Sequence, residues 1–151
     1  MKIAVAADHG GFLLKEHIKK ELSRSGHEIM DVGCFSEAST DYPDFGLKAS
    51  QLVSKGNAER AILICKSGIG MSIVSNKVKG VRGALCLDAG MAELSRKHND
   101  ANVLVLSASS MNHQKADDIV KKWLSTDFEG GRHQRRIEKI SNIENDTTSC
   151  E

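Results

Sequence analysis

Short apolar runs alternate along this chain with longer segments in which apolar residues recur every three or four positions. Five of the runs have the length of a strand, at residues 2–8, 27–33, 61–65, 83–88 and 102–107. The segments between them have helical spacing: Leu14, Ile18 and Leu22, for example, lie one turn apart in a predicted helix over residues 11–26. The pattern therefore predicts a regular alternation of strands and amphipathic helices.

Further helices are predicted at residues 45–56, 71–80, 90–100, 112–124 and 132–144. Met91 and Leu94 are expected to face the core in the third of these helices. The fourth helix carries a stripe of apolar residues that is also expected to be buried: Ile119, Val120, Trp123 and Leu124. Residues 36–44 are polar, contain the single proline, and predict a loop.

Apolar strands separated by amphipathic helices are typical of parallel sheets covered on both faces. The expected fold is therefore α/β: a Rossmann-like, doubly wound three-layer sandwich with a five-stranded parallel sheet and a C-terminal helix. One domain is expected over residues 1–145. Residues 146–151 are polar and predict a frayed tail.

The composition is that of an ordinary globular protein, with 40% hydrophobic and 27% charged residues. A net charge of +1 gives no general attraction to nucleic acid or to an anionic membrane, and no apolar run has the length of a membrane span. The four cysteines, at positions 34, 65, 86 and 150, form no C-x-x-C pair that would indicate a zinc site or a redox dithiol. Reduced thiols and the absence of a signal peptide favour a cytoplasmic protein.

Ligands of doubly wound sheets bind beyond the carboxyl ends of the strands. The most informative of these ends is Cys65-Lys66-Ser67-Gly68-Ile69-Gly70, where glycines allow backbone N–H groups to point at an oxyanion or a phosphate. The segment lacks the third glycine of a dinucleotide fingerprint and the G-K-[ST] triplet of a P-loop. A tight strand-to-helix connection without a ligand is the structural alternative.

Cys65 is the candidate reactive group, because clustered amides and the neighbouring Lys66 favour a thiolate that can act as a base or as a nucleophile. Cys86, inside a predicted strand, is expected only to pack. Structural alternatives also exist elsewhere: Asp8 could cap a turn, and His98 could simply lie at a helix end. Residues 132 and 136 are arginines one helical turn apart, which suits either a phosphate site or a solvated face.

Five segments together resemble the family of ribose-5-phosphate isomerase B and galactose-6-phosphate isomerase. They are "IAVAADHGG", "TDYPDFG", "ILICKSGIGMSI", "SRKHNDANVL" and "GGRHQRRIEKI", in this order over nearly the whole chain. The ribose branch is favoured by His98-Asn99-Asp100 and by the Arg132-His133-x-x-Arg136 ending. The resemblance implies a cofactor-free and metal-free aldose–ketose isomerase that works through an enediolate.

The resemblance also implies roles for single residues. Cys65 corresponds to the family's base, His98 to its ring-opening group, and Ser67 lies in the loop that stabilises the enediolate. The implied substrate-binding residues are Asp8, His9, Tyr42, Lys66, Gly68, Ile69, Gly70, Asn99, Arg132 and Arg136. Because the family's site lies at a dimer interface, a homodimer with shared sites is expected, with a tetramer as the larger alternative.

Two positions depart from the family pattern. Lys66 replaces a glycine, and a lysine at a position with positive φ would be strained by about 1 kcal/mol. Its ammonium could instead act on Cys65 or on the substrate, or simply point to solvent. Ser109 lies where the family usually has an arginine, so one expected phosphate or sugar contact is missing.

The sequence leaves four functional hypotheses. The leading one is an isomerase of ribose 5-phosphate and ribulose 5-phosphate, and a related one is an isomerase of another aldose phosphate, such as allose or galactose 6-phosphate. A non-catalytic phosphosugar-binding module is disfavoured because binding alone needs no thiol base. A thiol-redox enzyme is disfavoured because no partner cysteine is present.

Overall fold

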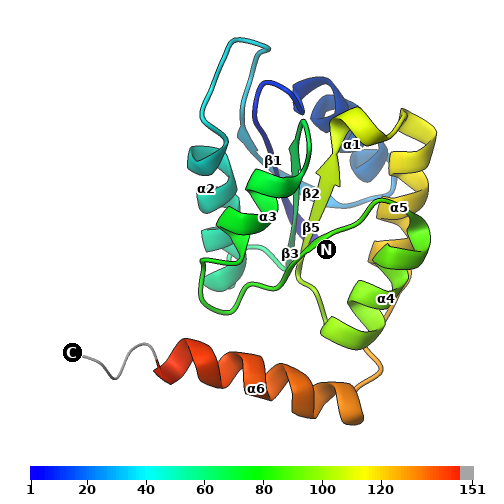
Figure 1. The fold of residues 1–151 in the computed structure, drawn as a ribbon. Helices are drawn as coiled ribbons and strands as arrows, with labels where there is room; N and C mark the ends of the chain where they lie inside the picture. Colours follow the sequence, from blue (N-terminus) through cyan, green and yellow to red (C-terminus); the bar gives the residue numbers. More distant parts are fainter. Residues whose placement is uncertain (147–151) are drawn as a thin grey trace.

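A computed structural model describes residues 1–146 (Figure 1). Its sheet contains five parallel strands in the order β2-β1-β3-β5-β4, which confirms the predicted fold class. The strands are β1 (Lys2–Ala7), β2 (Glu28–Gly33), β3 (Arg60–Cys65), β4 (Gly83–Leu85) and β5 (Val103–Ser107). The three central strands are almost fully buried, as their uninterrupted apolar sequences require, whereas β2 and β4 form the half-exposed edges.

Helices cover both faces of the sheet. They are α1 (Phe12–Arg24), α2 (Tyr42–Ser54), α3 (Ile69–Ser75), α4 (Ala89–Asn99), α5 (His113–Ser125) and α6 (Arg132–Asp146), with a short 3₁₀ turn at Ala108–Ser110. α1, α4 and α5 bury their apolar sides against one face, and α2 and α3 cover the other. α6 crosses the end of the molecule at the bottom of Figure 1. Within residues 1–146 no helix is long and apolar enough to cross a membrane.

The connections that leave β1 and β3 run in opposite directions across the sheet. β1 is followed by α1 on one face, whereas β3 is followed by α3 on the opposite face. The loops after these two neighbouring strands therefore diverge and leave a crevice at the carboxyl edge of the sheet, which is the usual ligand position in such folds. Asp8 and Cys65 lie at this point.

Three of the predicted elements are wrong in detail. α2 begins at Tyr42, inside the predicted loop, because Pro43 in the first turn needs no N–H partner and is preorganised for a helix. β4 has three residues instead of six. Met91 and Leu94 are 42% and 51% exposed instead of buried, since α4 turns Ala92, Ser95 and Arg96 inward.

The predicted stripe on α5 is largely confirmed, with Ile119, Val120 and Trp123 buried and Leu124 half-buried. The predicted strain at Lys66 is absent, because Asp100 is the single non-glycine residue with positive φ within residues 1–146. The helix after the Cys65 loop begins at Ile69, two residues earlier than predicted. Of the predicted tail, residues 147–151 lie outside the described part of the chain.

Candidate active site

Cys65 ends β3 and is held by the loop that follows it. The N–H of Gly68 donates a hydrogen bond to Cys65 Sγ over 3.2 Å, and Cys65 is 4% exposed. Gly68 can take the φ of 78° that aims its amide at the sulfur because it lacks a Cβ. The thiol of Cys65 thus lies at the carboxyl end of β3 with a backbone N–H directed at its sulfur.

Cys86 provides the contrast. It is 1% exposed at the end of β4, and burial raises the pKa of its thiol to about 11. A thiol with this pKa remains protonated at neutral pH and is a poor nucleophile and metal ligand. The structure therefore agrees with a packing role for Cys86.

The next residues of the Cys65 loop lie at the surface. Ser67 is exposed, and its Oγ accepts a hydrogen bond from the N–H of Ile69, itself 58% exposed. The ring of Tyr42 lies directly against Gly70, since a Cβ at that glycine would be 2.7 Å from two ring carbons. Gly70 thus allows the aromatic ring to close one side of the loop.

Asp8 and His9 come from the turn after β1. Asp8 is 8% exposed, and its Oδ1 accepts from the N–H of Gly11 over 3.1 Å, so the predicted turn-capping role is present. The exposed His9 has two hydrogen bonds with Thr40: its Nδ1 accepts from the Thr40 N–H, and its own N–H donates to Thr40 Oγ1. These contacts fix the imidazole at the mouth of the crevice and leave Nε2 for a ligand.

A cleft of about 390 Å³ separates the β1 and β3 turns, and it is lined by Asp8, His9, Gly10, Lys66, Ala108 and Ser109. The hydroxyls of Ser107 and Ser109 both donate to the carbonyl oxygen of Lys66, over 3.0 and 2.7 Å. These bonds tie the end of β5 to the Cys65 loop. Lys66 and Ser109, the two departures from the family pattern, therefore meet at one wall of this cleft.

His98 and Asn99 lie elsewhere in the chain, in the last turn of α4. The guanidinium of Arg82 donates to the carbonyl oxygens of Asn99 and Asp100, and Ala61, at the start of β3, donates its N–H to the carbonyl of Asn102. This group is therefore at the amino edge of the sheet. Four strand steps of about 3.3 Å separate Ala61 from Cys65 at the other end of β3, a distance of roughly 13 Å.

Arg132 and Arg136 belong to the same edge. Both are exposed on α6, and neither forms an ion pair within residues 1–146. The imidazole of His133 lies between them in sequence and stacks on that of His98, with ring centroids 4.2 Å apart. One chain thus places the predicted residues in two groups at opposite edges of its sheet (Figure 1), one around Cys65 and one around His98.

Sequence reasoning did not assign two residues of the second group. His133 was noted only as part of the Arg132–Arg136 motif, yet it is 95% buried against His98. Glu129 lies 3.6 Å from the His133 imidazole nitrogen. The sequence contains one signal, since Glu129 and His133 are four residues apart, which is the spacing of neighbours on a helix. Gly130 and Gly131 break the chain between them, so the spacing did not predict the contact.

A family model described as Ribose/Galactose Isomerase matches residues 3–140. The chain belongs to this family. It is accordingly an enzyme of the aldose–ketose isomerase class, as the resemblance predicted.

Individual relatives cover nearly the whole chain. Ribose-5-phosphate isomerase B of Escherichia coli K12 is 43% identical over 143 residues, which are 95% of this chain and 96% of the relative. The solved ribose-5-phosphate isomerase B of Clostridium thermocellum is 46% identical with a TM-score of 0.96, over 97% of this chain and 99% of that one. The Mycoplasma genitalium enzyme, solved with bound ribulose 5-phosphate, is 40% identical with a TM-score of 0.92, over 95% and 96% of the two chains.

Proposed function

We propose that this protein interconverts ribose 5-phosphate and ribulose 5-phosphate, with Cys65 as the base that moves a proton between C1 and C2. The observation that carries the proposal is the Gly68 N–H directed at Cys65 Sγ at the switch point of the sheet, beside a cleft lined by Asp8 and His9. Relatives named for this activity share 40–46% of their residues with the chain and nearly all of its length.

The reaction requires a base and a set of hydrogen-bond donors. Cys65 as thiolate accepts the proton from C2 of the open-chain aldose and returns it to C1, while negative charge develops on the sugar oxygens. The amides of residues 66–70 and the hydroxyl of Ser67 can donate to these oxygens, and loss of one such donor typically costs about 3 kcal/mol of transition-state stabilisation. Asp8, His9 and Tyr42 would hold the sugar. C1 is reduced as C2 is oxidised within the same molecule, so no step calls for an external oxidant, reductant or cofactor.

The second group has the complementary chemistry. His98 can transfer the proton that opens the furanose ring, with Asn99 beside it, and Arg132 and Arg136 can bind the phosphate as bidentate donors. Because these residues lie at the opposite edge from Cys65, a complete site requires two chains. We therefore propose a homodimer in which each site combines the Cys65 group of one chain with the His98 group of its partner.

Exposed apolar residues support this assembly. Ile69 and Ile73 on α3 are 58% and 56% exposed, and Met91 and Leu94 on α4 are similarly exposed. These helices precede and follow β4, an edge strand that pairs with β5 on one side. Apolar side chains on both sides of a free strand edge favour contact with a second copy, because burial of this surface is worth about 25 cal/mol per Å².

The experiment that tests the function is an isomerase assay with a panel of pentose and hexose phosphates. We expect the highest kcat/KM for ribose 5-phosphate. A preference for allose or galactose 6-phosphate would contradict the proposed substrate and would direct attention to Lys66 and Ser109. Binding of these sugars without turnover would contradict the proposed reaction and favour a binding module.

Arg136→Ala is expected to raise KM for ribose 5-phosphate about tenfold or more with a smaller change in kcat, because the phosphate contact is present in both the ground state and the transition state. Arg135→Ala, an exposed arginine on the same helix, is the matched control and should leave KM within twofold. Equal effects of the two substitutions would contradict a specific phosphate contact at Arg136.

A further inference from the structure

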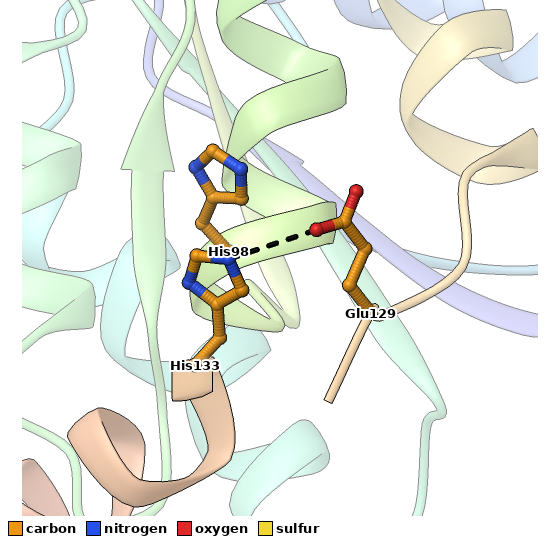
Figure 2. Close-up of side chains that lie close together, drawn as sticks. All are labelled: His98, Glu129 and His133. Atoms are coloured by element: carbon orange, nitrogen blue, oxygen red, sulfur yellow. Dashed lines mark ion pairs between the residues drawn. The ribbon is translucent and has the colours of Figure 1, made fainter. Parts of the chain in front are cut away.

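Figure 2 shows three side chains that gather at the junction of α4 and α6: His98, Glu129 and His133. One ligand atom of each residue lies within 4.8 Å of the others. Neither zinc binding nor any other metal chemistry is part of the isomerase mechanism proposed above. From this cluster we infer that the protein has a regulatory zinc site, in which the two imidazoles and the carboxylate bind one Zn²⁺ and a water completes the coordination.

The state of His133 is the first argument. The residue is 95% buried, and its Nε2 has no hydrogen-bond partner within residues 1–146. A buried polar nitrogen without a partner is destabilising. A ligand that coordinates this nitrogen would supply the missing partner.

The distance to Glu129 is the second argument. Glu129 Oε2 lies 3.6 Å from His133 Nε2, which is too long for a hydrogen bond. Two donors that share a tetrahedral zinc at bond lengths of about 2.0–2.1 Å are roughly 3.4 Å apart. The carboxylate beside the stacked rings in Figure 2 therefore has the spacing of a second metal ligand.

The backbone holds the three residues in place. The N–H of Glu129 donates to the carbonyl of Lys97, and the N–H of His133 donates to that of Gly130. The turn before α6 is thereby fastened to the end of α4. His98 is half-buried and Glu129 is exposed, so both side chains can rotate. To bind one ion, the ligand atoms must approach from within 4.8 Å to about 3.4 Å, and the His98 ring must turn out of its stack on His133 so that both nitrogen lone pairs point at the metal.

Two histidines and one glutamate form a ligand set that suits Zn²⁺, and imidazole nitrogen disfavours Mg²⁺ and Ca²⁺. Bound zinc would withdraw the His98 imidazole from proton transfer. Inhibition of the isomerase, which rests on the proposed function, is therefore the expected consequence. Metal binding itself does not depend on that function.

The test uses full-length protein from which metals have been removed by a chelator. Titration with Co²⁺ should produce the ligand-field absorption of a tetrahedral site, and one equivalent of Zn²⁺ per chain should abolish it. Glu129→Gln removes one ligand at an exposed position and should weaken the affinity for both metals tenfold or more. Glu138→Gln, an exposed glutamate of α6 outside the cluster, should leave the affinity unchanged.

Cys65→Ala tests whether the thiol of Cys65, instead of the cluster of His98, Glu129 and His133, binds the metal. The variant should bind Co²⁺ as the wild type does, with no thiolate charge-transfer band in either protein. Loss of the signal in Cys65→Ala, no tetrahedral signal in the wild type, or equal affinity of Glu129→Gln and wild type would each overturn the inference.

In activity assays Zn²⁺ should inhibit the wild type, and Glu129→Gln should shift the half-inhibitory concentration upward by the same factor as its affinity. Tetrahedral Co²⁺ binding in a protein without isomerase activity would overturn the proposed function and leave the metal site standing.

Discussion

Cys65→Ala is expected to lower kcat about 10²–10⁴-fold while leaving KM for the sugar phosphate nearly unchanged, because a general base contributes that much to the rate. The Gly68 N–H donates to the sulfur of Cys65, and Cys65 is the residue that ends β3. Steady-state kinetics with ribose 5-phosphate measure the effect. Cys86→Ala is the matched control, since burial keeps the thiol of Cys86 protonated and its removal should leave kcat within a few fold.

The same variant tests the two-chain site. His98→Asn should also be nearly inactive on the ring-closed substrate, but its Cys65 group is intact. Unfolding and refolding a one-to-one mixture of Cys65→Ala and His98→Asn chains should then restore about a quarter of wild-type activity, because half of the dimers are mixed and each mixed dimer has one intact site.

Three outcomes would contradict these expectations. Near-normal turnover of Cys65→Ala would exclude the thiol as the base. Two inactive variants whose mixture remains inactive, although size measurements show mixed dimers, would exclude a site shared between chains. A monomer that is fully active would have the same consequence.

Asp31→Asn is expected to destabilise the protein by about 3 kcal/mol, since it leaves a buried cation without its main partner. Lys15 is fully buried, and its Nζ donates to both carboxylate oxygens of Asp31 over 2.7 and 2.8 Å. Lys19 also pairs with this carboxylate. Urea unfolding followed by circular dichroism measures the change in the free energy of unfolding.

The control for this substitution is Glu28→Gln, on the same strand. Glu28 pairs with Lys2 across 3.4 Å, but both side chains are exposed, so its loss should cost less than about 1 kcal/mol. The double variant Lys15→Met, Asp31→Asn should recover part of the lost stability because the uncompensated charge is gone. Lys15 Nζ also lies 3.0 Å from a carboxylate oxygen of Glu16, so an Asp31→Asn protein as stable as the wild type would show that Lys15 does not depend on Asp31.

The same network predicts a loss of stability in acid. Burial acts to raise the pKa of Asp31, but the hydrogen bonds from Lys15 and Lys19 outweigh it and hold the pKa below its ordinary value of 3.8. The contribution of the ion pair is therefore complete above about pH 4 and decreases as the pH falls through the folded-state pKa of Asp31.

The sequence by itself determined the alternation of strands and helices, because short apolar runs and the 3.6-residue helical period can be recognised locally along the chain. It also placed Cys65 and its glycine loop at a strand end, and the family motifs assigned the reaction class. It did not determine which side of α4 is covered. Met91 and Leu94 have the right spacing for burial, but the helix packs with Ala92, Ser95 and Arg96 inward and leaves both apolar side chains exposed.

Tertiary structure alone decided how the chemistry is distributed. The family motifs assign Cys65, His98 and Arg136 to one site. In the fold, each strand runs toward one edge of the sheet and the helix after it runs back, so residues at strand ends and residues at helix ends lie at opposite edges. It also decided that His133 is buried against His98 with Glu129 beside it. Contacts between residues distant in the chain depend on how the elements pack, and a local pattern of residue types does not contain that information.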